Sequence, residues 1–230
     1  MKNLLIYNRL VIVLQRILDA VNNGHTHYVC GSCSIDKIEQ LLANFDMNYQ
    51  ACASRYQRLK RVRMGLGNVH LVLWYNHGVV YWWLLATAPE LGRHPIHETD
   101  NLKNALVVGE RIEINGYELV RLPKKGTAQT KLTWRMTSSK FENFHNGIVE
   151  AVRSRSHQRM RNILDYLWMC PGFNGIRVQT GNLAAMYRAE VKHASVKDAP
   201  MPRKRLYYLN RIDHIGISVK QLLSQVKAKT

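Results

Sequence analysis

The sequence predicts a mixed α+β protein, and three observations support this. Segments whose apolar residues recur every three or four positions predict helices, and the short β-branched and aromatic runs between them predict strands. Apolar residues make up 46% of the 230 residues, which is enough for a packed core. Lys and Arg number 33 against 16 Asp and Glu, a net charge of +17 that favours polyanionic partners.

Two domains are expected, because composition changes along the chain. Residues 1–137 combine predicted helices with β-hairpins, which favours a winged-helix-like or an RRM-like domain. Residues 138–230 are predicted to be a basic, mainly helical extension. Residues 1–54 hold four cations and four acids, whereas residues 116–230 hold 21 cations and seven acids. The positive charge is therefore concentrated and predicts a binding surface.

The first elements follow from local patterns. An apolar stripe predicts a helix over 3–22, and a β-like run follows at 25–31. Asp36 and Glu39 have the spacing of a capping box, which predicts a second helix over about 35–45. A turn of three residues, 46–48, is expected to end that helix.

The next segment, from Ser54 to Gly65, is predicted to be a cationic helix that Gly65 ends. It contains five cations and no acid. The cations are Arg55, Arg58, Lys60, Arg61 and Arg63. Tyr56 and Leu59 belong to an apolar stripe that we expect to pack, with the cations largely off that face. A purely cationic face attracts a phosphate backbone, and the alternative is a solvated basic helix.

A β-hairpin is predicted over about 68–87, with its turn at Asn76-His77-Gly78. A helix-turn-helix over about 35–63 followed by this hairpin has the order of a winged helix. The rival interpretation is an RRM-like sandwich. The hairpin is aromatic, which predicts either a sheet buried on both faces or a platform for stacked bases. No Lys or Arg occurs in 64–87, which disfavours the platform.

The remaining elements extend the basic surface. We expect a helix over 97–108 and a second hairpin over about 111–137, whose tip holds Lys124, Lys125 and Lys131. Ser139 and Glu142 have capping-box spacing and predict the start of the next helix. Further helices are expected up to residue 168, over 175–193 and over 217–229.

Two more basic groups lie in this second half. Arginines without an intervening acid separate two apolar stripes, and a basic run closes the linker that begins at residue 199. The predicted phosphate contacts here are Arg153, Arg155, Arg159, Arg161, Arg203, Lys204 and Arg205.

Two groups of residues suggest chemistry, and neither has a complete pattern. Cys30-Gly31-Ser32-Cys33 has the CxxC spacing of a zinc half-site, but no second pair of ligands follows it. His94 and His97 lie near Glu98 and Asp100, a set that a metal-dependent nuclease could use. Since neither set has a partner motif elsewhere, we predict no catalytic residue, no metal and no cofactor.

The sequence thus predicts a non-catalytic nucleic-acid-binding protein, whose partner is DNA or RNA. One alternative is an RNA-binding subunit of a nucleoprotein assembly, which would add a protein partner. The other is the nuclease. Four cysteines predict no dense disulfide pattern, and neither a convincing signal peptide nor an apolar run of membrane-spanning length is present. We therefore expect a cytoplasmic protein without a membrane partner.

Overall fold

The structure is a computed structural model, which describes residues 4–123, 126–212 and 216–227. It is a mixed α+β structure with two sheets. The described residues fall into two compact units. Unit 1 comprises residues 1–111 and 211–230, and unit 2 comprises residues 112–210.

Unit 1 is built on a six-stranded sheet with the order β5-β2-β4-β3-β1-β9. The strands are β1 (Leu5–Tyr7), β2 (His27–Ser34), β3 (Val69–Asn76), β4 (Val79–Ala86), β5 (Lys103–Asn104) and β9 (Ile217–Ser218). β1 is parallel to β3, and the other neighbours are antiparallel. His77 and Gly78 both have positive φ, at 47° and 85°, so the predicted hairpin turn is confirmed as the type that joins twisted strands.

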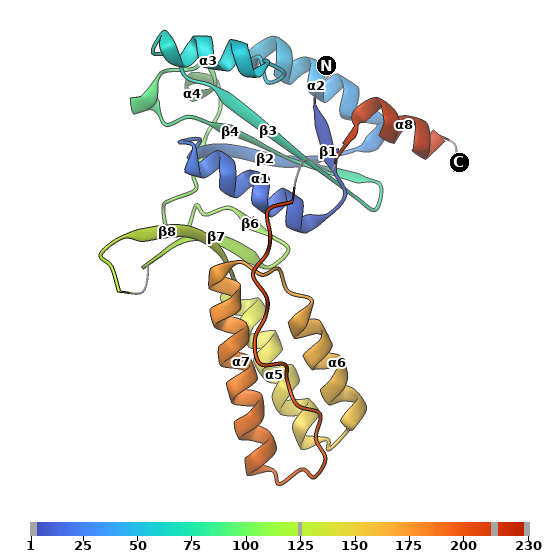
Figure 1. Cartoon of the computed structure of the whole chain (residues 1–230). Helices are drawn as coiled ribbons and strands as arrows, with labels where there is room; N and C mark the ends of the chain where they lie inside the picture. Colours follow the sequence, from blue (N-terminus) through green and yellow to red (C-terminus); the bar gives the residue numbers. More distant parts are fainter. Residues whose placement is uncertain (1–3, 124–125, 213–215, 228–230) are drawn as a thin grey trace. The chain divides into compact units, whose positions relative to one another are not determined.

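Helices cover both faces of this sheet (Figure 1). One face packs against α2 (Ile38–Tyr49) and α8 (Val219–Lys227) through a core that includes Leu73, Leu84 and Ile38. Strand alternation places the buried Val72 on the opposite face, toward α1 (Leu10–Asn22). The expectation of a sheet buried on both faces is therefore confirmed.

Neither detailed fold prediction describes unit 1. In a winged-helix domain the hairpin forms a wing beside the helices, whereas here the hairpin strands β3 and β4 occupy the middle of a six-stranded sheet. An RRM stacks bases on its sheet, but helices cover both faces here. The helix-turn-helix also changes, because α2 continues through the predicted turn to Tyr49 and residues 50–54 join it to α3 (Arg55–Arg63).

Unit 2 combines a three-stranded antiparallel sheet with three helices. Its elements are β6 (Glu113–Ile114), β7 (Tyr117–Pro123), β8 (Thr130–Met136), α5 (Ser138–Arg153), α6 (His157–Trp168) and α7 (Asn174–His193). The helices run alongside one another (Figure 1), and Trp134 and Tyr187 are fully buried in its core. Asn115 and Gly116 form the turn between β6 and β7, both with positive φ.

The boundary between the units differs from the predicted one at residue 137. The β7–β8 hairpin belongs with the helices, because the Gln179 side chain of α7 accepts from the Met136 amide at 2.6 Å and donates to the Met136 carbonyl at 3.1 Å. Residues 217–218 return to unit 1, where β9 pairs with β1. Such pairings join residues far apart in sequence and leave no local pattern.

Several predicted elements have other bounds. The predicted helix over 3–22 is a strand followed by α1, and that over 97–108 reduces to α4 (Ile96–Thr99) before β5. Thr137, not Ser139, caps α5 by accepting from the Lys140 amide. Two short 3-10 helices are also present, η1 (Ile35–Lys37) and η2 (Pro89–Leu91). The predicted capping box of Asp36 and Glu39 does not begin α2, because the N-cap residue is Lys37 and no side chain caps the helix there. Among the described helices none is long and apolar enough to cross a bilayer.

Candidate nucleic-acid interface

The cationic helix forms where it was predicted, with both ends fixed by local hydrogen bonds. The Ser54 hydroxyl accepts from the Gln57 amide, and the Gln57 side chain accepts from the Ser54 amide, which completes a capping box. At the other end the Leu66 amide donates to the Arg61 carbonyl and the Gly65 amide to the Val62 carbonyl. This is a Schellman motif with Gly65 at φ 68°, so the predicted stop is confirmed.

The orientation of α3 is the reverse of the prediction. Tyr56 and Leu59 of the predicted stripe are 74% and 49% exposed, and Val62, three residues further along the helix, is also exposed, so this side of α3 does not pack. Arg58 and Arg61 are half-buried instead. The buried Asn68 side chain donates to the Arg58 carbonyl at 3.2 Å, which turns this side of α3 inward. The outward cations of α3 are therefore Arg55, Lys60 and Arg63.

Two histidines beside α3 have structural hydrogen bonds. His94 is 3% exposed and its Nδ1 accepts from the Ile96 amide. His97 donates from Nε2 to the Thr87 carbonyl at 2.9 Å and accepts at Nδ1 from the His94 amide at 3.1 Å. Burial, helped by the positive charges of Arg61 and His97, lowers the pKa of His94 to about 4. A neutral, buried His94 is therefore expected near pH 7.

The acids that the nuclease hypothesis needs are not gathered around these histidines. Asp100 accepts a hydrogen bond from the Tyr49 hydroxyl at 2.5 Å, and Glu90 and Glu98 are exposed. Over the described ranges no three His, Cys, Asp or Glu side chains are placed to hold one metal ion. This geometry lends the nuclease hypothesis no support.

Cys30 and Cys33 lie on β2, three residues apart. Because strand side chains alternate, the two thiols point to opposite faces of the sheet, and Cys33 packs toward the α2 side. One metal ion cannot take both thiols in this arrangement. That the pair is not a structural zinc site stays a prediction, and the strand gives a physical reason for it.

The turn between α5 and α6 gathers exposed arginines into what we call the arginine corner. It consists of Arg153, Arg155, Arg159 and Arg161. Ser156 caps α6 by accepting from the Arg159 amide, and Arg155 adopts φ 51° in the turn. None of these four side chains forms a hydrogen bond or ion pair with another described residue. No acid occurs between residues 151 and 164, and the nearest acids in sequence are Glu150, three residues before Arg153, and Asp165, four residues after Arg161.

The last basic run lies on an extended segment, residues 199–210, which we call the strap. It runs back along the helices of unit 2 (Figure 1), and the Tyr187 hydroxyl donates to the Pro200 carbonyl at 2.7 Å. Arg203, Lys204 and Arg205 are exposed on it. On the second hairpin Lys131 is exposed, whereas Lys124 and Lys125 lie outside the described residues. The predicted cations thus fall into separate groups on the two units.

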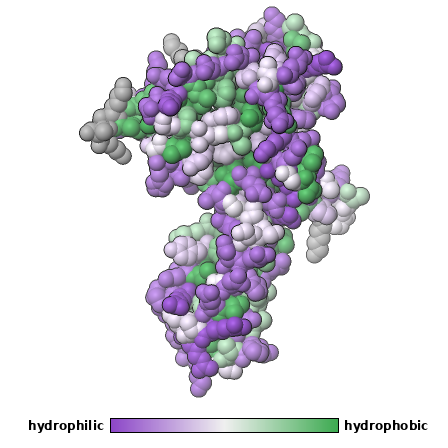
Figure 2. All heavy atoms as spheres, turned by 180° about the vertical axis from the view of Figure 1, so that it is seen from behind, coloured by the Kyte–Doolittle hydropathy of each residue, from purple (hydrophilic) through white to green (hydrophobic). Residues whose placement is uncertain are grey.

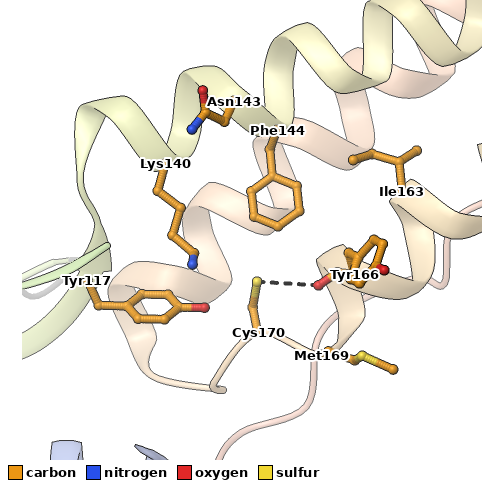
Figure 3. A pocket seen from close by; sticks show the side chains of 8 residues that line it. All are labelled: Tyr117, Lys140, Asn143, Phe144, Ile163, Tyr166, Met169 and Cys170. Carbon is orange, nitrogen blue, oxygen red and sulfur yellow. Dashed lines mark hydrogen bonds between the residues drawn. The ribbon is translucent and has the colours of Figure 1, made fainter. Parts of the chain in front are cut away.

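Unit 2 also contains a cavity of about 400 Å³ (Figure 3) that sequence reasoning missed. Its walls combine apolar and polar side chains. They are Tyr117, Lys140, Asn143, Phe144, Ile163, Tyr166, Met169 and Cys170. The Lys140 ammonium lies 4.4 Å from the centre of the Tyr117 ring and donates to the Asn115 carbonyl at 3.1 Å.

The cavity holds no activated nucleophile. Burial raises the pKa of the Cys170 thiol even though Lys140 is near, and burial also raises the pKa of the Tyr117 phenol. Both groups are therefore protonated at neutral pH, and a protonated thiol is a poor nucleophile.

Exposed apolar side chains accompany the cations on both units. Figure 2 shows one face of the molecule, on which hydrophobic atoms reach the surface among hydrophilic ones. The exposed large side chains include Tyr56 and Val62 on α3 and Tyr207 and Tyr208 on the strap. The two strap tyrosines were not predicted as site residues, although a Tyr pair two positions after Arg205 is a readable signal.

Comparisons with protein-family models, with curated proteins and with solved structures find no match to this chain.

Proposed function

We propose that the protein binds nucleic acid without catalysis and that the arginine corner is its main phosphate contact. The supporting observation is that four exposed arginines lie at the end of α5, in the turn and in the first two turns of α6, and that none of their side chains has a hydrogen-bond or ion-pair partner among the described residues. A guanidinium group offers several donors in a plane and can bind a phosphate through two hydrogen bonds. Arginines that are not paired within the protein keep these donors available.

The position of the corner favours contact with a long polyanion. Arg153 ends α5, Arg155 lies in the turn, and Arg159 and Arg161 lie in the first two turns of α6. The first turns of a helix also present free amides and a partial positive charge, which adds to the attraction for phosphate. Gln158 and Asn162 are exposed on the same part of α6 and bond to each other at 2.8 Å.

Helix α3 offers fewer accessible cations than the arginine corner. Arg58 and Arg61 are half-buried, and Arg58 donates to the Ala53 carbonyl at 2.9 Å, so neither is free to approach a backbone fully. Only Arg55, Lys60 and Arg63 remain as outward cations on that helix. We therefore assign α3 a secondary contact and the arginine corner the primary one.

The test is a salt titration with a matched charge control. Arg155→Ala/Arg159→Ala removes two charges from the corner, and Arg9→Ala/Lys220→Ala removes two exposed charges elsewhere. Each phosphate contact releases counterions, so the corner variant should lower the slope of log affinity against log salt by about two. The control should leave that slope within about half a unit of the wild-type value.

Affinity should be measured by fluorescence anisotropy on labelled duplex DNA, duplex RNA and single strands of equal length. A wild-type protein that binds none of them at low salt would refute nucleic-acid binding. Equal slopes for the corner variant and the control would refute the assignment to the corner. Melting curves must accompany each variant, and we expect no change because all four residues are exposed.

A second candidate function is a subunit of a nucleoprotein assembly. The outward stripe of Tyr56, Leu59 and Val62, with cations beside it, favours this candidate because exposed apolar surface next to charge is typical of protein interfaces. It predicts that the protein from its own cells sediments as a complex larger than the chain alone after complete nuclease treatment. Sedimentation as the free chain would argue against it.

A further inference from the structure

The backbone of the strap is fixed on both sides of Tyr207 and Tyr208. Arg177 on α7 donates from Nε to the Leu206 carbonyl at 2.8 Å, and the Leu209 amide donates to the Gly172 carbonyl at 3.1 Å. Gly172 permits this contact, because a Cβ there would lie 2.2 Å from the Tyr207 carbonyl oxygen. The strap is thus held closely against the turn between α6 and α7 at the two tyrosines.

Both tyrosine rings are nevertheless directed away from the core. Tyr207 is 73% exposed and Tyr208 is 66% exposed. The Arg177 guanidinium lies 3.3 Å from the centre of the Tyr208 ring, a cation–π contact that covers one face of this ring and fixes its orientation. Two large aromatic side chains are therefore presented to solvent on a backbone that is already ordered. Such preorganisation lowers the entropy cost of binding.

Free cations precede the rings on the same segment. The side chains of Arg203, Lys204 and Arg205 are exposed and form no hydrogen bond or ion pair among the described residues. Three residues of extended chain span about 10 Å, so these cations and the rings can contact neighbouring nucleotides of one strand. Exposed aromatics beside cations are what sequence-independent single-strand binders use.

We propose that the strap is a stacking platform for a single-stranded nucleic acid. Tyr207 and Tyr208 stack on bases, and Arg203, Lys204 and Arg205 contact the phosphates. This proposal rests on the proposed function and specifies its substrate as a strand with unpaired bases. The aromatic hairpin of unit 1 does not take this role, because Trp83 is buried and Trp82 packs on Phe45.

The experiment uses the full-length chain and four probes of equal length. The probes are single-stranded DNA, single-stranded RNA, an abasic DNA strand and duplex DNA. Tyr207→Ala/Tyr208→Ala should lose about tenfold or more in affinity per tyrosine for both base-containing single strands. Its affinity for the abasic strand should stay at the wild-type value, because phosphate contacts remain. Tyr207→Phe/Tyr208→Phe should bind like the wild type, because the rings remain.

Tyr56→Ala is the matched control, since Tyr56 is an equally exposed tyrosine beside cations on α3. It should not change the preference for a base-containing strand over an abasic one. If Tyr207→Ala/Tyr208→Ala weakens binding to both single-stranded DNA and single-stranded RNA, the tyrosines stack on the bases of either polymer. If it weakens binding to only one of them, that polymer is the ligand.

Two failures remain distinguishable. If the wild type binds no probe at low salt, the proposed function itself fails. If the wild type binds with a steep salt dependence but the double alanine variant keeps its preference for base-containing strands, only the platform is refuted. Melting curves should coincide for all variants. If the double alanine variant melts early, Tyr207→Ala alone is tested in its place, because the Tyr207 side chain is 73% exposed.

Discussion

At the residue scale, the packing of Trp82 depends on Gly31. Gly31 on β2 pairs with Trp82 on β4, and a Cβ on Gly31 would lie 2.6 Å from an atom of the indole ring. The ring also packs edge-on against Phe45 of α2, with 4.9 Å between ring centres. A side chain on Gly31 would therefore displace a ring that joins the sheet to α2.

Gly31→Ala should lower the free energy of unfolding by about 1–3 kcal/mol, the usual cost of overpacking a well-packed site. Gly181→Ala is the matched control, because Gly181 lies in α7 with no atom within 4 Å of the added Cβ. It should raise the free energy of unfolding by about 0.5–1 kcal/mol through helix propensity. Urea unfolding followed by tryptophan fluorescence and by circular dichroism measures both. Equal effects of the two substitutions would contradict the packing described for Trp82.

The sequence predicts single residues best where backbone conformation decides. Gly65 and the His77–Gly78 turn are confirmed because positive φ strongly favours particular residue types. The N-caps show the limit of this reasoning. Ser139 and Glu142 have capping-box spacing, yet Thr137 caps α5, because β8 ends at Met136 and leaves Thr137 at the start of the helix. Two candidate caps in one segment cannot be distinguished without the preceding strand.

At the element scale, a hydrogen bond and not the amphipathic pattern sets which side of α3 faces inward. The helix has nine residues and none of them is buried. Such a short helix gains little from packing a stripe, whereas the buried Asn68 fixes the rotation of the helix through the Arg58 carbonyl. The sequence shows the apolar stripe, but its pattern does not determine whether the stripe faces the core or the solvent.

Replacing Leu59 and Val62 together by Gln should therefore leave the free energy of unfolding within about 0.5 kcal/mol of the wild-type value. If Leu59 were packed, as the sequence predicts, the loss of its side chain alone would lower the free energy of unfolding by roughly 2–5 kcal/mol. Leu42→Gln in α2, where Leu42 is 2% exposed, is the positive control and should destabilise strongly. Thermal and urea unfolding of the three proteins distinguish the two orientations, and a large loss in the α3 variant would restore the predicted one.

The longer elements were easier to predict than the short ones. α5, α6 and α7 are confirmed as helices because each repeats its apolar positions over three or more turns. β1 and β5 have only three and two residues, so the sequence pattern merged β1 into a helix and replaced β5 by one. Short strands form through pairing with distant neighbours, here β3 and β2.

At the scale of the whole molecule, the two units should be separable by cutting at their boundaries. A fragment of residues 112–210 contains its own core around Trp134, Leu167 and Tyr187 and the helices α5 and α7 that pack on β8. It should unfold cooperatively with a helical circular dichroism spectrum. The fragment 138–230, cut at the sequence-based boundary, loses the hairpin that packs on α7 and should not unfold cooperatively.

Both fragments should be compared by urea unfolding and by analytical ultracentrifugation. Cooperative unfolding of 138–230, or aggregation of 112–210 alone, would contradict the division into units. If the shorter fragment folds, it also contains the arginine corner and the strap, so it should retain most of the salt-dependent affinity for nucleic acid. The sequence alone could not reveal that β9 and α8 rejoin the first unit.

This interrupted layout of unit 1 has a consequence for synthesis on the ribosome. Residues 112–210 are continuous in sequence, so unit 2 has all of its strands and helices once residue 210 has emerged. Unit 1 is completed only after β9 and α8 have emerged, because β9 pairs with β1 and because Val219 and Leu222 of α8 are part of the core of unit 1. During that interval the edge of β1 and the core surface beneath α8 are uncovered, and unpaired edges of this kind invite association between nascent chains. β1, which precedes unit 2 in the sequence, is therefore completed by a strand that follows unit 2.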